Sequence, residues 1–565
     1  MKCKFLFLIG LAVSIKANCQ TIKPGQTWND TSGAAINAHG GCVQYHDGTY
    51  YWFGETRSGS TCNGVSCYSS TDLINWKKLP NAMTPTGTKT DECIDVAQGR
   101  TIERPKVIYN EKTDKWVMWF HWENGSDYSQ AKVAVLTSDN ITGPYTLTEN
   151  GVFRPNDKDS RDQTLFLDTD GRAYHVSSTN TNYQTHFIRL SDDFTKPTDE
   201  ESVQVLGMRY EAASMFKYGD TYWCLFSGCD GWNANRGRYI WYVGDDPIED
   251  WNYGRDFYAN NSWGVDFCVD NGNTKCYTSQ PAYVFPVQGR DKCFIYMGDR
   301  WTSSNVGGSK YVWCPLSVRS GYPAVRWYDS WNLSVFDKMY QKKRLEKLED
   351  GKEIYLLERY SDRIVSRPGT GWTLEDDAAN NVCFILHETD EPYTWRLEQK
   401  SSGQFFACSA LGTMKLVEGN AGDEQQKWTF VLQEDGYYYL KSNSSGKVLS
   451  VSGNSTQAGT SVYMADRDNA KDYPTHQSFA VYYDSEEHPD YVEADMYSKE
   501  YKAANIAAME IQQRYFDEKE KAAGVSQVAG NANKEAVIYT LQGVRIKNIT
   551  KSGFYIVDGE KVYIR

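Results

Sequence analysis

Five polar residues recur along the first half of the chain, each ahead of a turn and an aromatic strand. The set consists of His39, Glu103, Asp162, Glu211 and Gln280. Their intervals of roughly 50 to 70 residues are typical of a β-propeller, in which each repeat forms one four-stranded blade. Because equivalent positions at the start of the innermost strands face the central axis, the sequence predicts that these five side chains meet in one cleft.

A cleft with two glutamates and an aspartate points to acid-base chemistry on a sugar. Glycoside hydrolysis normally takes one carboxyl group that protonates the leaving oxygen and a second group that activates water or attacks the sugar. A further carboxylate nearby keeps the proton on the acid by like-charge repulsion. We therefore expect an enzyme with a cleft at the propeller axis.

Length and composition fit a secreted multidomain protein that acts on carbohydrate. A chain of 565 residues is too long for one core. Aromatic residues make up 14% of it, with 18 Trp and 40 Tyr, which favours surfaces that stack on sugars; packing between blades is the alternative for most of the Trp. The net charge of -13 argues against nucleic acid and anionic membrane as partners.

The first 20 residues have the pattern of an export signal. Lys2 and Lys4 precede an apolar run over 5–13, and Lys16 disfavours lipidation at Cys19. We found no other apolar run long enough to span a bilayer, so we expect no membrane insertion. We expect the protein to be secreted, periplasmic or at the cell surface. In such an oxidising compartment three close cysteine pairs are disulfide candidates, namely Cys62/Cys67, Cys224/Cys229 and Cys268/Cys276. Zinc ligation is disfavoured, because CxxC pairs with nearby His are absent.

The turn-and-strand repeats predict an all-β catalytic domain over 28–340, a propeller of five blades. A second domain is expected over 345–484, where Gln426-Lys-Trp428 and Gln477-Ser-Phe479 end successive units. This pattern resembles the ricin-type β-trefoil, which implies a carbohydrate-binding domain; a trefoil that only supports the propeller is the alternative. A helical segment and linker are expected over 485–534. The β-rich segment 535–565 resembles the sorting domains of exported Bacteroidetes proteins.

The motifs around the five polar residues resemble glycoside hydrolase family 43. They are His39-Gly40-Gly41, Glu103-Arg104-Pro105, Arg161-Asp162-Gln163, Tyr210-Glu211-Ala212 and Ser279-Gln280-Pro281, with Tyr51–Glu55 and Gly298–Trp301. The nearest branch is the exo-β-1,3-galactanases, and the β-galactofuranosidase and α-L-arabinofuranosidase branches are close. The resemblance implies hydrolysis of β-1,3-galactan or arabinogalactan to galactose with inversion. A propeller that binds carbohydrate without catalysis is the alternative.

The resemblance also assigns roles within the cleft. It implies that Glu211 is the general acid, that Asp162 tunes its pKa, and that Glu103 binds the 2-hydroxyl or supports the site. Most family members carry the base as an Asp on the first blade, where this chain has His39. As in the galactanase branch, Gln280 is then expected to hold the water, through an amide that could accept a proton as its imidic tautomer. His39 is the rival base.

Further expectations complete this interpretation. An inverting enzyme would separate Glu211 from the water-holding group by roughly 6.5 to 9.5 Å. Secondary sugar contacts are expected from Glu55, His39, Tyr128, Asn180, Ser227 and Trp301. The partner is an oligosaccharide or polysaccharide of the β-galactan type, and the protein is expected to be a monomer. No cofactor is expected to be required, with a structural calcium ion in the propeller as the alternative.

Overall fold

The computed structural model describes residues 21–59, 61–206, 208–249, 251–253, 267–270, 275–377, 380–433, 435–468 and 475–522, together with four short strands after residue 537. The expected export signal lies outside the described residues. Among the described helices, none is long and apolar enough to cross a membrane.

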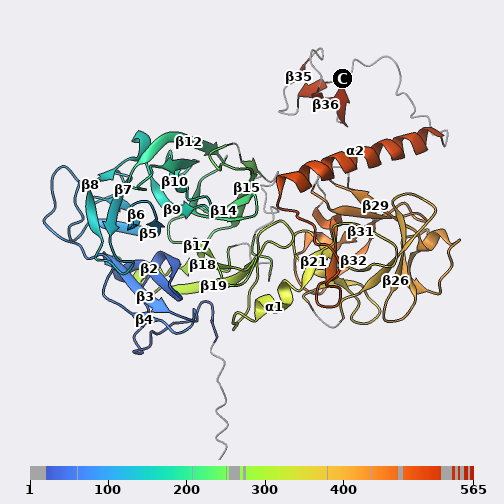
Figure 1. Ribbon diagram of the computed structural model, residues 1–565, viewed down its shortest axis with the longest axis horizontal. Coiled ribbons are helices and arrows are strands. Elements are labelled where there is room, and N and C mark those ends of the chain that lie inside the picture. The colour runs from blue at the N-terminus through green and yellow to red at the C-terminus, as the bar shows by residue number, and fades with distance from the viewer. Residues whose placement is uncertain are drawn as a thin grey trace, which may run out of the picture. The chain divides into compact units, whose positions relative to one another are not determined.

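Five four-stranded antiparallel sheets follow one another along the chain (Figure 1). The first two blades contain β1 (His39–His46), β2 (Thr49–Ser58), β3 (Thr61–Ser70), β4 (Lys77–Lys78), β5 (Thr101–Asn110), β6 (Lys115–Glu123), β7 (Lys132–Ser138) and β8 (Thr146–Phe153). The third and fourth contain β9 (Arg161–Leu167), β10 (Ala173–Thr179), β11 (Gln184–Leu190), β12 (Pro197–Val205), β13 (Tyr210–Tyr218), β14 (Thr221–Gly228), β15 (Gly237–Val243) and β16 (Asn252–Tyr253). The fifth contains β17 (Gln280–Pro286), β18 (Phe294–Arg300), β19 (Lys310–Ser317) and β20 (Ala324–Val325). The five-bladed propeller is confirmed.

Aromatic side chains of the second and third strands fill the space between blades. Trp52, Trp119, Trp223 and Trp313 are fully buried, and the rings of Trp52 and Trp313 from the first and fifth blades lie 4.7 Å apart. Ile22 exchanges two backbone hydrogen bonds with Trp331, just before α1 (Val335–Met339). Most of the tryptophan therefore serves packing, which was the alternative to a sugar-facing role.

A β-bulge sits where each innermost strand enters the axial region. In the second blade Glu103 pairs with His121 and Lys106 pairs with Trp119. Two residues of β5 therefore lie opposite one residue of β6. The residue after the predicted site residue takes a positive φ in three blades, at Gly40 (58°), Arg104 (52°) and Ala212 (64°). Bulges of this kind re-aim side chains next to active sites.

The third blade departs from the register that we predicted. Arg161 pairs with Ser178 and Thr164 with Val176, so Arg161 occupies the position that Glu103 and Glu211 hold in their blades. Asp162 is the bulge residue itself, with φ 39°. The equivalence that we assumed for Asp162 is wrong by one residue, because a bulge shifts the phase of a strand without changing its composition.

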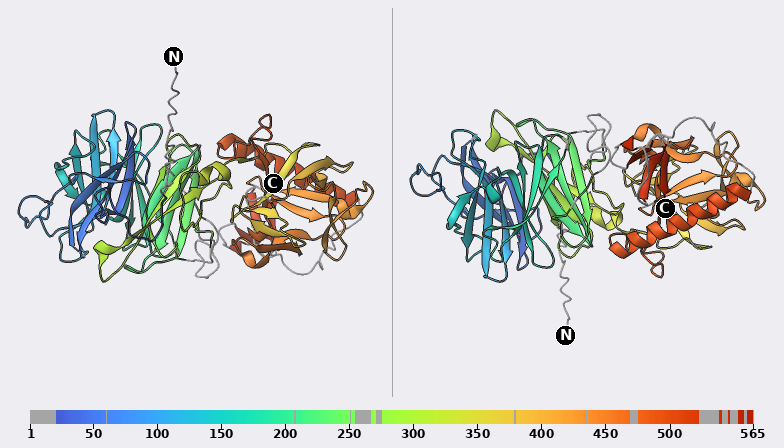
Figure 2. Two further views of the ribbon diagram at one scale, coloured as in Figure 1. Left: turned by 90° about the horizontal axis from the view of Figure 1, so that it is seen from below. Right: turned by 90° about the horizontal axis from the view of Figure 1, so that it is seen from above.

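The predicted trefoil is confirmed as three units of four strands, shown in yellow to orange in Figure 2. The first two units contain β22 (Glu353–Glu358), β23 (Ile364–Ser366), β24 (Thr373–Glu375), β25 (Phe384–Glu388), β26 (Thr394–Gln399), β27 (Phe405–Cys408), β28 (Met414–Val417) and β29 (Trp428–Leu432). The third contains β30 (Tyr438–Ser442), β31 (Val448–Val451), β32 (Thr460–Ala465) and β33 (Phe479–Asp484), and β21 (Lys342–Arg344) pairs with β33.

The Gln-x-aromatic pattern has the same physical basis in two units. The Gln426 amide donates to the Glu418 carbonyl at 2.8 Å, and the Gln477 amide donates to the Asp466 carbonyl at 2.9 Å. The aromatic residue that follows is buried: Trp428 stacks on Phe406 with ring centroids 4.4 Å apart. Each glutamine thus ties a loop to the strand that delivers a core ring.

The remaining short elements lie in connections and after the trefoil. The 3-10 helices are η1 (Pro155–Asp157), η3 (Val306–Gly308), η4 (Glu424–Gln426), η5 (Ser452–Asn454) and η6 (Thr475–Gln477). The predicted C-terminal helix is confirmed as α2 (Lys499–Ala522). Residues 509–565 form a compact unit of their own, with the strands β34 (Ile538–Thr540), β35 (Arg545–Ile546), β36 (Gly553–Val557) and β37 (Glu560–Ile564) in one sheet.

The disulfide candidates are not bonded in the structure. All twelve cysteines among the described residues are free. Cys62 and Cys67 lie on the same strand, β3, five positions apart. An extended strand rises about 3.3 Å per residue, so five positions place the two Cα atoms farther apart than the roughly 7 Å that a disulfide can bridge. Closeness in sequence was therefore misleading.

Candidate active site

Glu211 lies at the start of β13 with only 8% of its surface exposed. Its Oε1 accepts a hydrogen bond of 2.7 Å from Gln280 Nε2, and its Oε2 accepts one of 3.1 Å from Asn182 Nδ2. Burial, and then repulsion from the Asp162 carboxylate, raise the pKa of Glu211 to about 8. The carboxyl group therefore carries a proton at neutral pH.

Asn182 is a contact of Glu211 that we did not predict from the sequence. Its Nδ2 also donates to Cys229 Sγ at 3.2 Å, while its Oδ1 is buried and pairs with no described residue. A protonated Glu211 needs an acceptor for its O–H, and rotation of the Asn182 amide by half a turn would supply Oδ1. The expected contact, Asn180, is exposed, and its backbone N–H donates to Asp159.

Gln280 at the start of β17 is held at both ends of its amide. Its Oε1 accepts from Arg104 Nη2 at 2.5 Å and from Trp301 Nε1 at 2.8 Å. An imidic tautomer would place a hydrogen on Oε1, against these two donors, so the contacts stabilise the ordinary amide. No group of the described residues accepts the second amide N–H of Gln280, which can therefore donate to water.

The separation that we expected between acid and water-holding group is not present in this structure. Gln280 and Glu211 are in direct contact at 2.7 Å rather than roughly 6.5 to 9.5 Å apart. The reason is local: a buried carboxyl group and an amide with a free N–H satisfy each other when no sugar lies between them.

Arg104 connects the residues of four blades and is the main member of the site that sequence reasoning missed. It is buried, and its Nε lies 3.0 Å from Asp162 Oδ1 while its Nη1 donates to the Pro281 carbonyl at 2.9 Å. Its backbone N–H donates to Glu55 Oε1 at 2.7 Å. The signal was in the sequence, since Arg104 directly follows Glu103 within one of the recognised motifs, but residue type alone does not show that its side chain reaches the other blades.

Glu103 is the ionised carboxylate of the cleft. Burial opposes its charge, but the ion pair with His121, the positive charge of Arg57 and a hydrogen bond from Tyr128 outweigh it and lower the pKa of Glu103 to about 2. Arg57 Nη2 lies 3.0 Å and the Tyr128 hydroxyl 2.8 Å from Glu103 Oε1. Glu211 and Glu103 therefore differ in charge, one protonated and one ionised, as acid catalysis with a charged sugar-binding group would require.

Glu55 and His39 are engaged by protein groups rather than directed at open space. Glu55 is 1% exposed; its Oε2 accepts from Arg57 Nε and its Oε1 from Arg104. His39 is fully buried, with Nδ1 at 3.0 Å from Asp299 Oδ1 and Nε2 at 3.3 Å from the Gly307 carbonyl. Both ring nitrogens of His39 therefore already have partners.

Aromatic side chains surround these polar groups. Tyr128 is 48% exposed, and Trp301 is half-buried. Trp232, from the connection between β14 and β15, packs edge-on against Trp301 at 5.1 Å and lies over the Arg57 guanidinium. Such rings suit stacking on a sugar. Ser227 is buried opposite Glu211 in the register, and its hydroxyl donates to the Gly228 carbonyl.

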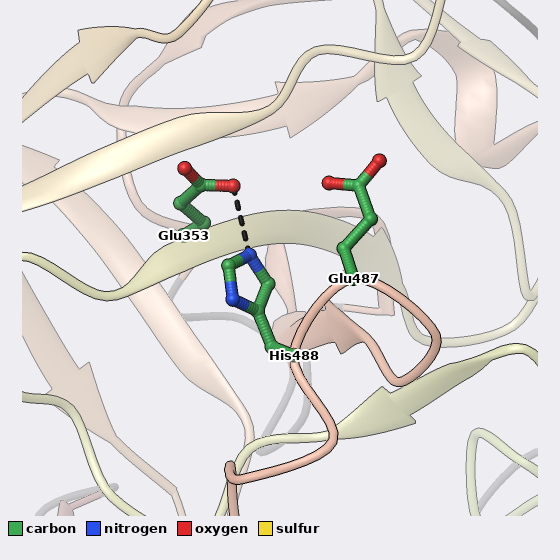
Figure 3. Close-up of side chains that lie close together, drawn as sticks. All are labelled: Glu353, Glu487 and His488. Atoms are coloured by element: carbon green, nitrogen blue, oxygen red, sulfur yellow. Dashed lines mark hydrogen bonds and ion pairs between the residues drawn. The ribbon is translucent and has the colours of Figure 1, made fainter.

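One group of described residues has the composition of a metal site, and it lies in the trefoil. Figure 3 shows Glu353, Glu487 and His488 with the contact of 2.9 Å between Glu353 and His488. The Lys400 ammonium lies 2.6 Å from Glu353 and 3.1 Å from Glu487 and supplies the positive charge there. The expectation about a structural calcium ion in the propeller remains untested.

Comparisons with known proteins agree with this geometry. The model of glycosyl hydrolases family 43 matches residues 38–255, and that of the ricin-type beta-trefoil lectin domain-like family matches residues 371–465. No curated protein matches the chain.

Solved structures cover nearly the whole chain. A GH43 β-1,3-galactosidase is 46% identical over 86% of this chain and 99% of that chain, with a TM-score of 0.80. An exo-β-1,3-galactanase from Clostridium thermocellum is 28% identical over 82% of this chain and 99% of that chain, with a TM-score of 0.50. A variant of the Phanerochaete chrysosporium exo-β-1,3-galactanase with β-1,3-galactotriose is 25% identical over 82% and 100%, also with a TM-score of 0.50. This chain belongs to glycoside hydrolase family 43 and is a glycoside hydrolase.

Proposed function

We propose that this protein is an exo-β-1,3-galactanase that releases galactose from the end of β-1,3-galactan or arabinogalactan chains with inversion. The observation that carries the proposal is the hydrogen bond between the protonated Glu211 and Gln280, in a cleft whose first-blade position holds His39 and no carboxylate. The names of the β-1,3-galactosidase and exo-β-1,3-galactanase structures to which the chain is similar support the substrate class.

Glu211 protonates the oxygen of the glycosidic bond. With a pKa of about 8 the carboxyl group of Glu211 is protonated, and therefore neutral, at acid and neutral pH. Because the group is buried, its proton is available only to a bound sugar. After transfer the Glu211 carboxylate is stabilised by the N–H donor of Asn182. Asp162 raises the pKa of the acid, and Arg104 limits this effect by pairing with Asp162.

Gln280 holds the attacking water through its second amide hydrogen. A sugar that takes the Glu211 proton replaces the contact between the two residues, which brings the site to the open arrangement of an inverting enzyme. Arg104 and Trp301 withdraw electron density from the carbonyl and fix the amide plane. The oxocarbenium-like transition state has little bond to water, so orientation matters more than basicity. The proton that the water loses as the new C–O bond forms passes to solvent water.

Glu103 and the aromatic side chains around the cleft hold the terminal sugar. The ionised Glu103 accepts from the 2-hydroxyl, and the Tyr128 hydroxyl beside it contributes a donor. Trp301 and Trp232 stack on the sugar. The trefoil binds further carbohydrate, and the protein acts after export; these parts of the proposal rest on the ricin-type match and on the N-terminal sequence pattern.

Product profiling tests this function against the alternatives. We expect wild-type protein to release only galactose from β-1,3-galactan, and to leave aryl galactofuranosides and arabinofuranosides largely intact. Glu211→Gln is the control that separates enzymatic release from contamination. Release of arabinose or furanosidic galactose would favour the related activities of the family, and tight galactan binding without any product would favour a non-catalytic propeller.

A further inference from the structure

A cavity of about 150 Å³ lies between the fifth blade and the trefoil. It shares no lining residue with the candidate active site. Five of its eleven lining side chains are cationic, namely Lys292, Arg319, Lys342, Lys343 and Arg344. Only two lining residues, Asp291 and Glu493, are carboxylates. A cavity with this excess of positive charge attracts anions.

Arg344 on β21 carries a buried charge without a carboxylate partner. The residue is 3% exposed, and among the described residues no carboxylate lies within ion-pair distance of it. The nearby Asp435 carboxylate pairs with Arg359 instead. Its Nη2 donates to the Asp435 carbonyl at 3.2 Å, its Nη1 reaches Met496 Sδ at 3.6 Å, and its guanidinium lies over the Tyr437 ring. A buried charge without a partner lowers the stability of the folded state, so an anion bound beside the Arg344 guanidinium would stabilise the protein.

Two lysines of the cavity share one carboxylate. Lys292 and Lys343 both pair with Glu493, the latter at 3.2 Å. Asp291 lies at the exposed rim, where the Tyr218 hydroxyl donates to it at 2.9 Å. One lysine and Arg344 therefore have no carboxylate of their own in the cavity, and the carboxylate of Asp291 at the rim opposes part of their charge.

The other cations of the cavity are already paired. Arg319 Nε lies 2.9 Å from both oxygens of Asp362, and its Nη2 lies 3.0 Å from Asp377. Lys342 has looser contacts, at 3.5 Å with Asp377 and 3.9 Å with Asp484. The cations that lack a carboxylate partner of their own are thus Arg344 and one of the two lysines that share Glu493. An anion in the cavity has to balance these two charges rather than all five.

We propose that this cavity binds a small doubly charged tetrahedral oxyanion, such as inorganic phosphate or sulfate. The volume takes such an ion with one or two waters, since water occupies about 30 Å³ in the liquid. A guanidinium binds two oxygens of a phosphate side by side, and an ammonium adds a point charge. The ion would bridge Lys292 of the fifth blade and Lys343 and Arg344 of the strand that joins the trefoil. The inference is independent of the proposed hydrolase activity.

The test measures binding to the full-length protein. Sodium phosphate is titrated at constant ionic strength, balanced with sodium chloride, while the melting temperature and the heat of binding are recorded. We expect phosphate and sulfate to raise the melting temperature, because a ligand of the native state stabilises it by mass action. Phenyl phosphate is the third arm: its failure to bind would indicate a free inorganic ion, and equal binding would indicate a phosphate ester.

Matched variants locate the effect. Lys343→Ser removes one cavity ammonium and should weaken phosphate binding at least tenfold, whereas Lys347→Ser changes a lysine that is 76% exposed and lines no part of the cavity. Arg344→Met should abolish the response and keep or raise the melting temperature in phosphate-free buffer, because it removes the unpaired charge. A wild-type response equal to that of chloride, or equal responses of the two lysine variants, would overturn the proposal.

Discussion

Gln280 Nε2 donates a hydrogen bond of 2.7 Å to Glu211 Oε1, and so joins the fifth blade to the fourth across the cleft. The Gln280 carbonyl is occupied by Arg104 and Trp301, so the amide can rotate only if both contacts break. Glu211 and Gln280 are thus positioned by one another and by Arg104. In the proposed mechanism, this arrangement makes Gln280 a donor to the attacking water rather than an acceptor of its proton.

Glu211→Gln should reduce hydrolysis of β-1,3-galactan by a factor of about 10² to 10⁴ without loss of folding, since the proton donor is removed and the shape is kept. Initial rates of galactose release give the measurement. A variant that retains more than a tenth of wild-type activity on an unactivated substrate would rule out Glu211 as the acid.

The same variant should also be more stable at neutral pH. Because the folded pKa of Glu211 is raised to about 8 from an ordinary value of 4.5, ionisation disfavours the folded state, and its cost grows as pH rises from 4.5 to 8. Melting curves of Glu211→Gln and wild type should therefore coincide near pH 4 and separate in favour of the variant near pH 8. A wild type that is more stable at pH 8 would contradict the raised pKa.

The activity of the wild type should fall above about pH 8, where Glu211 loses its proton. Asp162→Asn removes a negative charge that repels the Glu211 carboxylate. It also removes the ion-pair partner of Arg104, whose positive charge then acts more strongly on Glu211, and both changes lower the pKa of Glu211. The alkaline limb of kcat/KM should then move to lower pH. Asp159→Asn is the matched control at a nearby carboxylate, and a limb that does not move in Asp162→Asn would remove the tuning role from Asp162.

Arg104→Lys should cost about 10² or more in kcat with little change in secondary structure. Lysine keeps the charge, but it cannot contact Gln280, Pro281 and Asp162 at once as the guanidinium does. Arg209→Lys, at an exposed position, is the control. If both variants retain wild-type kcat, the position of Gln280 does not depend on Arg104.

Variants of Gln280 and His39 show which of the two residues acts on the attacking water. Gln280→Ala should remove most turnover while galactan binding is spared. Gln280→Glu should stay weak and shift its pH optimum, because it adds a negative charge beside Glu211. His39→Gln should cost less, since both His39 nitrogens bind protein groups. An inactive His39→Gln with near-normal Gln280→Ala would make the imidazole the base.

Much of the fold could be predicted because both repeats leave marks in the sequence. Turn and aromatic strand recur in every blade, and Gln426 and Gln477 each precede a buried ring of the trefoil. The β-bulges could not be predicted, because an extra residue in a strand changes its phase but not its composition. For that reason Arg161, and not Asp162, occupies the blade position that we had assigned.

The sequence predicted which residues belong to the cleft better than it predicted how these residues contact one another. Glu211 and Gln280 are in contact, as the repeat implied. Glu103 is connected to them through Arg57, Glu55 and Arg104. Arg104 was missed because an arginine next to a glutamate reads as its ion-pair partner, whereas the bulge turns it toward the other blades. Asn182 was missed because the choice between it and Asn180 depends on the conformation of one tight loop.

The most direct test of the central claim is proton NMR of the first product released from β-1,3-galactan, recorded before mutarotation. Direct attack by water held at Gln280, with Glu211 as acid, predicts galactose alone and initially as the α-anomer. Galactose that appears first as the β-anomer, or oligosaccharides in place of galactose, would contradict the account.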